Sequence, residues 1–338
     1  MLVYFTRRLL LAFFTVWVIS ILAWVIIQLP EGDAVDTYFW ALETGGDSQG
    51  HNEERMNAMR NYLGLDQPMY IRYIKWIWRL SQGDLGRSFL GTISYSAVDK
   101  PVKNLIGDRL WLTVVLTGFT IMVTWTFAIP VGIYSGVRQH SVGDYTFTLL
   151  GFTGLAVPDF LLGLVLMYVG YSVFDQSVGG LFSADYIDKP LSVGKFLDLL
   201  EHLWIPAIVL GTSGTASLIR IMRNNLLDEM GKPYVVTARA KGVHPFRLII
   251  KYPVRVSINP LVSTIGYLLP SLVSGSVIVS VVLSLPTIGP LLLTAILSED
   301  SFTAGFIILM LGILTVVGTL ISDILLAVVD PRIKFTGS

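Results

Sequence analysis

A serine that could act as a nucleophile stands in Gly211-Thr212-Ser213-Gly214, which has the form GxSG. Such a serine needs a histidine base within hydrogen-bond reach. If the segment is a helix rising about 1.5 Å per residue, His202 lies roughly 16 Å from Ser213 along the axis. No histidine follows His244. An intramembrane hydrolase would therefore lack its base, and we interpret the small residues as a site of close helix packing.

Other side chains that carry common enzyme chemistry are missing or scattered. The chain has no cysteine, which excludes disulfides and thiolate catalysis. Its histidines lack metal-ligand spacing such as HExxH. They are His51, His140, His202 and His244. No GxxxxGK followed by Ser or Thr occurs, so we expect no nucleotide site of that kind. We expect no catalytic residue, metal or cofactor in this chain. If ATP hydrolysis drives its activity, we expect ATP and Mg²⁺ to bind on partner subunits.

One carboxylate stands in a strongly apolar environment. Asp159 follows Pro158 near the middle of an apolar segment, where insertion of an ionised carboxylate costs roughly 2.5–3.5 kcal/mol. Two explanations stay open. Asp159 faces a water-filled pathway or a partner subunit, or it caps backbone groups freed by the proline or is protonated.

The elements that must position these residues are membrane spans. The chain has 338 residues, of which 53% are hydrophobic and 14% charged, and its mean hydropathy is +0.66. A bilayer core of roughly 30 Å needs about 20 apolar residues in a helix. The first candidate span lacks a small-x-small cleavage site, so we interpret it as retained. These criteria predict an all-α integral membrane protein with about six transmembrane helices, near 9–29, 110–133, 144–172, 202–220, 257–284 and 301–328.

Charge placement orients the predicted spans. The loop at 220–256 holds only Asp228 and Glu229 against a majority of basic residues, which the positive-inside rule assigns to the cytoplasm. Its basic residues are Arg220, Arg223, Lys232, Arg239, Lys241, Arg247, Lys251 and Arg255. An even number of spans then puts both termini in the cytoplasm. The plasma membrane of a bacterium or archaeon is what the family resemblance given below implies. We divide the chain into 1–29 (N-terminus and first span), 30–108 (extracytoplasmic), 109–328 (a core of five helices that includes the loop) and 329–338 (cytoplasmic tail).

The segment 30–108 is the one long polar stretch. Within it, residues 69–80 alternate aromatic or aliphatic side chains with basic ones, which predicts an amphipathic helix. Such a helix suits the membrane interface, where tryptophan and tyrosine are favoured and lysine or arginine stems can extend to water. An equally good interpretation is that these aromatics form the core of a small extramembrane subdomain.

The basic loop carries a recognisable sequence. Residues 234–247 resemble the coupling motif of binding-protein-dependent ABC importers, in the form found in dipeptide/oligopeptide permeases, which reads close to YVRTARAKG. The resemblance implies that seven residues couple this chain to a nucleotide-binding subunit. They are Thr237, Ala238, Arg239, Ala240, Lys241, Gly242 and Val243. A short helix with Ala238 and Ala240 could enter a cleft on that subunit, and Gly242 would let the chain turn sharply.

Further motifs extend the resemblance over nearly the whole chain. Residues 63–68 and 83–89 look like the LGLDxP and GDLGxS signatures of the same permeases, and Asp330-Pro331-Arg332 resembles their closing DPR. The resemblance implies a type I ABC importer permease without enzymatic activity of its own. It also implies a second, similar permease, with a heterodimer expected, two ATPase subunits and an extracytoplasmic solute-binding protein.

Two departures from the pattern leave the cargo open. Val236 stands where the family usually has arginine, and Ser280 where it usually has glutamate. Ser280 and Asp159 are candidates for the solute pathway, so a departure there affects which cargo is expected. Because related permeases also carry oligosaccharides, the resemblance leaves both oligopeptides and oligosaccharides open as the cargo. The alternative of an ion-coupled secondary transporter should show several intramembrane ionisable groups, whereas only Asp159 is clearly deep.

Overall fold

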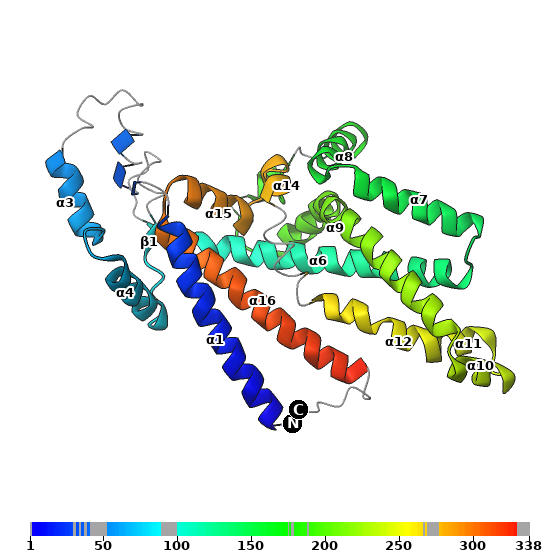
Figure 1. Cartoon of the computed structure of the whole chain (residues 1–338). Coiled ribbons are helices and arrows are strands. Elements are labelled where there is room, and N and C mark those ends of the chain that lie inside the picture. Colours follow the sequence, from blue (N-terminus) through cyan, green and yellow to red (C-terminus); the bar gives the residue numbers. More distant parts are fainter. Residues whose placement is uncertain are drawn as a thin grey trace. The chain divides into compact units, whose positions relative to one another are not determined.

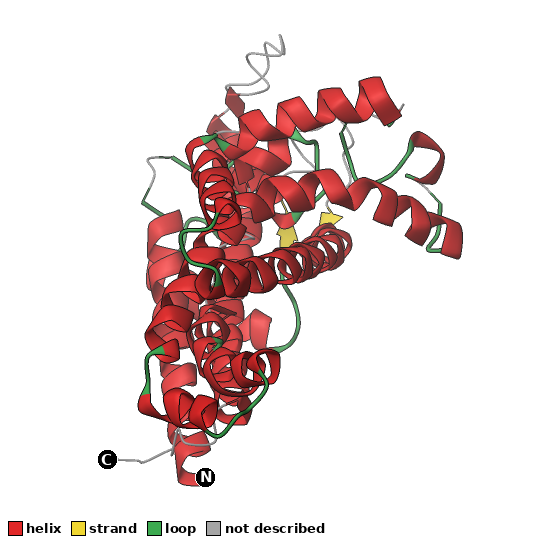
Figure 2. Cartoon of the chain, turned by 90° about the vertical axis from the view of Figure 1, so that its right-hand side faces the viewer, coloured by secondary structure: helices red, strands yellow, loops and turns green. Residues whose placement is uncertain are grey.

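The structure is a computed structural model whose described part is almost entirely helical (Figures 1 and 2). It describes residues 2–29, 32–33, 35–36, 39–40, 53–88, 100–174, 176, 179–187, 189–265, 268 and 277–329. The longer helices are α1 (Leu2–Ile27), α3 (Glu53–Leu63), α4 (Met69–Ser81), α6 (Val102–Val137), α7 (Val142–Ala156), α8 (Asp159–Phe174), α9 (Val193–Met230), α15 (Ile288–Leu297) and α16 (Ser301–Val329). The closing DPR motif lies outside the described residues.

Short elements connect these helices. They are β1 (Arg87–Ser88), β2 (Lys100–Pro101), η1 (Ala184–Tyr186), α10 (Pro233–Ala240), α11 (Pro245–Ile249), the π-helix η2 (Ile250–Val254), α12 (Arg255–Ser257) and α14 (Val277–Val282). The strands β1 and β2 pair antiparallel, with Arg87 opposite Pro101. The chain forms two compact units, a first unit of Met1–Leu112 with Thr287–Val316 and a second unit of Thr113–Pro286 with Val317–Ser338.

Among the described residues, four helices are long and apolar enough to cross a membrane, or five if α7 and α8 count as one span. They are α1 from Arg8, α6, α9 and α16 to Leu326. Part of the predicted span at 257–284 lies outside the described residues. The helix α9 has 38 residues, and at about 1.5 Å per residue it is longer than the roughly 30 Å bilayer core requires.

The prediction of one continuous span over 144–172 is wrong. The structure divides it into α7 and α8, which meet at a bend of 103°. Val157 ends α7 in an extended conformation, as expected for a residue whose helical geometry is opposed by the following proline ring. Asp159 therefore opens α8 and does not lie in the middle of a helix.

In the first unit, the described part of the predicted 30–108 segment packs against α1 and the start of α16. Trp24 of α1 stacks on Trp76 of α4, with ring centroids 5.0 Å apart, and both pack with Leu309 of α16. The hydroxyls of Ser20 and Tyr73 are hydrogen-bonded at 2.8 Å. These contacts hold α4 against the spanning helix α1, which Figure 1 shows beside α16.

The helix α4 has one apolar face in a core and one that is exposed, and its place at a membrane interface stays a prediction. Trp76 and Tyr73 belong to the core just described. Tyr70, Ile74 and Trp78 follow one another at helical spacing on a neighbouring side of the helix and are about two-thirds exposed. A core face together with an exposed aromatic face is what a helix at the membrane interface requires.

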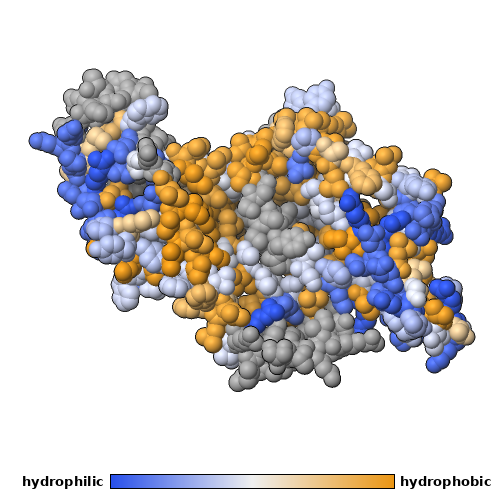
Figure 3. Space-filling model, in the orientation of Figure 1, coloured by the Kyte–Doolittle hydropathy of each residue, from blue (hydrophilic) through white to orange (hydrophobic). Residues whose placement is uncertain are grey.

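The second unit is built around α6 and α9. Its core cluster joins Ala128 of α6 to Met222 and Leu226 of α9, and to Val254 and Leu261 further along the chain. The helix α14 packs against α8. Apolar side chains also remain on the surface of each unit, over α1 in the first and α8 in the second (Figure 3). Exposed apolar faces on helices of this length indicate lipid as the solvent.

Candidate functional site

The predicted coupling residues form a compact helical hairpin in the second unit. We define the basic hairpin as α10, α11 and the turn Lys241–His244 between them. Pro233 opens α10 and Pro245 opens α11, where proline's fixed φ favours the first turn and its missing N–H would have no helical partner. Two prolines twelve positions apart in the chain thus fix where both short helices begin.

The turn of the basic hairpin is a Schellman motif. The Val243 N–H donates to the Ala238 carbonyl at 3.4 Å, and the Gly242 N–H donates to the Arg239 carbonyl at 3.0 Å. Gly242 adopts φ +73°, the left-handed conformation that the motif requires and that glycine adopts without steric cost. No atom lies within 4 Å of the position its Cβ would take. The glycine is therefore needed for the backbone conformation, not for space.

The basic hairpin has a small core of its own. Val235, Ala238 and Leu248 are buried together, with Val243 and Tyr252 packed around them. Ala238 is 6% exposed and faces the hairpin core, and the part that it and Ala240 play in coupling stays a prediction. Ala240 is exposed. The reason is the helical period, because Ala238 is three residues from Val235 and shares its inward face.

The outward face of the basic hairpin combines positive charge with apolar surface. Arg239, Lys241 and Arg247 are exposed, and no carboxylate pairs with them within the described part of the chain. Val236 is 53% and Phe246 71% exposed. Free cations beside exposed apolar side chains are the features of a surface that binds another protein.

A continuous helical path connects the basic hairpin to the core of the second unit. Ile249 packs against both the hairpin core and the α6–α9 cluster. Immediately after it, η2 contains Pro253, whose carbonyl accepts a hydrogen bond from the Ser257 hydroxyl at 2.8 Å. Single π-helical turns of this kind are frequent at functional sites. A displacement of the hairpin must therefore shift η2 against α6 and α9.

Sequence reasoning missed a second polar feature of this unit, a buried ion pair. The Arg223 guanidinium of α9 donates two hydrogen bonds of 3.0 Å to the two carboxylate oxygens of Asp144 on α7. Asp144 also accepts the backbone N–H of His140 at 3.0 Å. The two partners are separated by 79 residues, so no local spacing could have revealed them.

The two predicted pathway residues lie on helices that pack together, α8 and α14. Asp159 is partly exposed in the first turn of α8, where the helix dipole favours a negative charge. Ser280 is fully buried and its hydroxyl has no hydrogen-bond partner. No hydrogen bond joins Asp159 to Ser280 in the described structure, and their roles in a pathway stay predictions.

The GxSG segment packs helices together. A Cβ at Gly211 would lie 2.8 Å from the Thr124 hydroxyl of α6, so the glycine permits that close approach. His202 is buried and its Nδ1 lies 2.7 Å from the Asp198 carbonyl, one turn away on α9. Beside Gly211 an apolar cavity of about 320 Å³ opens between α6, α7 and α9. Among the described residues, no three His, Asp or Glu side chains gather closely enough to hold a metal ion.

Comparison with known proteins adds three findings. The family described as "Binding-protein-dependent transport system inner membrane component" matches residues 128–335, which include the basic hairpin. A putative peptide permease protein of Brucella ovis is 32% identical over 99% of this chain and 100% of its own length. The oligopeptide transport system permease protein AppB of Bacillus subtilis is 33% identical, over 98% of this chain and 99% of that protein.

A further relative and a solved structure agree with these findings. The dipeptide transport system permease protein DppB of Escherichia coli K12 is 30% identical over 99% of both chains. A chain of the MetNI methionine ABC transporter, solved in inward-facing conformations, matches with a TM-score of 0.53. That match has 16% identity, covers 69% of this chain and 100% of the other, and is a likeness of fold.

Proposed function

Because this chain belongs to the family of binding-protein-dependent transport system inner membrane components, we propose that its basic hairpin receives the motion of ATP-hydrolysing partner subunits. The chain is a permease subunit of an ABC importer. The observation that supports the coupling role is an outward face whose cations have no carboxylate partner among the described residues, and which Ile249 and η2 link to the core of the second unit. Acidic and apolar side chains on a nucleotide-binding subunit would complement that face.

We propose that the cargo is a peptide. The relatives named above carry peptide, oligopeptide or dipeptide transport in their names. An extracytoplasmic solute-binding protein would deliver the peptide to a pathway between this chain and a second, homologous permease. Two ATPase subunits would bind ATP and Mg²⁺. The excess of basic residues in 220–256 supports a cytoplasmic hairpin and cytoplasmic termini.

The test compares two exposed glycines in the assembled importer. Gly242 has φ +73° and Gly231 ends α9 at φ −82°, and neither has an atom near its Cβ position. Gly242→Ala forces a side chain into the left-handed region at a cost of about 1–2 kcal/mol, whereas Gly231→Ala is compatible with its backbone. In proteoliposomes with the binding protein, we expect Gly242→Ala to lower peptide-stimulated ATP hydrolysis and peptide uptake. Gly231→Ala should retain both.

Stronger variants extend this test. Gly242→Asp, or deletion of 238–242, should leave a folded, membrane-inserted subunit whose partners no longer hydrolyse ATP in response to peptide. Normal peptide-stimulated uptake by the deletion variant would refute the coupling role. Stimulation of wild-type ATP hydrolysis by an oligosaccharide-loaded binding protein, and not by a peptide-loaded one, would refute the cargo. Uptake by the purified chain without ATPase subunits would identify an ion-coupled carrier.

A further inference from the structure

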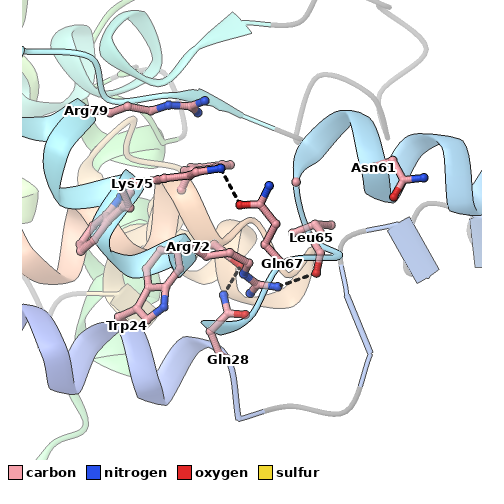
Figure 4. A pocket seen from close by; sticks show the side chains of 12 residues that line it. Trp24, Gln28, Asn61, Leu65, Gln67, Arg72, Lys75 and Arg79 are labelled. Carbon is pink, nitrogen blue, oxygen red and sulfur yellow. Dashed lines mark hydrogen bonds between the residues drawn. The ribbon is translucent and has the colours of Figure 1, made fainter. Parts of the chain in front are cut away.

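The first unit contains a cationic pocket that the transport role does not use. It has a volume of about 240 Å³, many times the roughly 10–15 Å³ that a single water-sized probe occupies. Arg72, Lys75 and Arg79 line it from one face of α4, at helical spacing (Figure 4). Its remaining walls come from α1, from the turn between α3 and α4, and from the start of α16. Among the described residues, no Asp or Glu lines the pocket.

No carboxylate among the described residues forms an ion pair with the cations of this pocket. The Lys75 ammonium donates to the Gln67 side-chain oxygen at 2.6 Å, and the Arg72 guanidinium donates to the Leu65 carbonyl at 3.2 Å. Arg79 extends across the pocket (Figure 4). Burial lowers the pKa of Arg72, partly offset by the Asp33 carboxylate. The Asp33 carboxylate itself forms a salt bridge with the Arg60 guanidinium at 2.7 Å.

Two buried tryptophans line this pocket, and their indole N–H groups have no hydrogen-bond partner in the part of the chain that the structure describes. Trp24 and Trp76 both line it and are 4% and 2% exposed. Among the described residues, no acceptor lies within hydrogen-bond reach of either Nε1–H. A buried donor without an acceptor is unfavourable, and most such groups in folded proteins are paired. Three cations and two free indole donors around one cavity thus call for a ligand that is anionic and rich in acceptors.

The depth of the pocket in the membrane identifies the source of such a ligand. Trp24 and Gln28 lie in the last turns of α1 and at its end, where a candidate span stops. On the same turns, Ile26 and Leu29 are exposed. The pocket therefore opens where the apolar surface of a spanning helix meets the aqueous boundary. Phospholipid phosphates occupy this depth, and aromatic and basic side chains are favoured there.

We propose that this pocket binds the phosphate headgroup of an anionic phospholipid. The phosphate oxygens accept from Arg72, Lys75 and Arg79 and from the two indoles, and the acyl chains follow the exposed apolar side of α1. The exposed side of α4 at Tyr70, Ile74 and Trp78 lies on another part of the helix surface than the cations and contacts the surrounding lipid. An acidic segment of the solute-binding protein would satisfy the cations, but it would leave that aromatic face without an apolar partner. The bound lipid fixes α4 at the interface independently of the cargo.

The experiment measures lipid selectivity of the intact importer in nanodiscs. Wild-type protein in phosphatidylcholine discs is titrated with phosphatidylglycerol, and retained lipid is counted by native mass spectrometry. We expect Arg72→Gln/Lys75→Gln to lower the preference for phosphatidylglycerol about tenfold or more, since each basic residue near the surface contributes to anionic-lipid binding. The control Lys103→Gln/Lys189→Gln removes the same charge from exposed residues that do not line the pocket and should retain the preference.

A second variant separates headgroup binding from a folding defect. Trp24→Phe/Trp76→Phe keeps the aromatic packing and the charge but removes both indole donors, so it should weaken phosphatidylglycerol binding while gel-filtration profiles stay unchanged. Equal binding of the two lipids by wild type would overturn the proposal, as would displacement of the lipid by millimolar inorganic phosphate without detergent. Loss of solute-binding-protein association in the Arg72→Gln/Lys75→Gln variant, with lipid retention unchanged, would assign the pocket to a protein carboxylate instead.

Discussion

Two basic amphipathic segments, α4 in the first unit and the basic hairpin in the second, use their large side chains in opposite ways. The α4 helix buries Trp76 and Tyr73 against the spanning helix α1. The hairpin buries only Val235, Ala238 and Leu248, largely among its own residues, and exposes Phe246. The first segment is thus anchored permanently to a membrane helix. The second keeps a large apolar side chain and three cations available to a partner.

This difference explains why similar composition leads to different expected functions. A helix whose aromatics are shared with α1 and α16 cannot move without breaking that core. A hairpin with its own small core can be displaced as a body, and its displacement passes through Ile249 to η2 and α9. Composition indicates that a segment is interfacial, but the location of its buried contacts decides whether it anchors or couples.

The largest expected effect tests the anchoring of α4. Trp76→Ala removes a buried indole stacked on Trp24, and such truncations cost about 3–5 kcal/mol. Trp78→Ala, on the exposed side of the same helix, should change stability by less than about 0.5 kcal/mol. Thermal unfolding followed by gel filtration in detergent measures both. Equal losses for the two variants would show that α4 is not anchored through Trp76.

A somewhat smaller effect concerns the polar anchor of the second unit. Arg223→Met leaves the Asp144 carboxylate buried without its cation. We expect the free energy of unfolding to fall by about 2–4 kcal/mol. This is less than the about 3–5 kcal/mol lost when one partner of a fully buried ion pair is removed, because Arg223 is partly exposed. The matched variant Arg220→Met removes a cation stacked on the Phe152 ring and should cost at most about 1 kcal/mol. The same unfolding assay distinguishes them, and indistinguishable midpoints would contradict a structural role for the pair.

The hairpin itself should separate stability from function. Leu248→Ala opens a cavity in the small hairpin core. We expect it to lower the free energy of unfolding by about 2 kcal/mol, the low end for a buried leucine, because few neighbours surround it. Phe246→Ala should leave the unfolding midpoint unchanged because Phe246 is 71% exposed, yet it should lower peptide-stimulated ATP hydrolysis in the assembled importer. Full stimulation in Phe246→Ala would exclude this side chain from the partner contact.

The smallest expected effect concerns one hydrogen bond between α4 and α1. Tyr73→Phe removes the hydroxyl that bonds Ser20 at 2.8 Å, for an expected loss of about 0.5–1.5 kcal/mol. Ser20→Ala should cost a similar amount. In a double-mutant cycle the two losses should be less than additive because they remove the same interaction. Strict additivity would mean that the hydroxyls do not interact.

The sequence by itself determined the features that depend on near neighbours in the chain. Long apolar runs predicted spans, the amphipathic pattern at 69–80 predicted α4, and two prolines with Gly242 set the helices and turn of the basic hairpin. Pro158 also ends α7, a signal that the prediction of one span over 144–172 overlooked. Helical period and proline or glycine backbone limits act within a few residues, so the sequence carries them directly.

Only the tertiary structure decided which faces these elements bury and which distant residues meet. It turns Ala238 inward, buries Ser280, joins Asp144 to Arg223 and surrounds one pocket with cations of α4 and the indole of Trp24 on α1. These outcomes depend on the packing of helices brought together by the whole fold. Local spacing does not encode such contacts, because each is a property of two segments and the geometry between them.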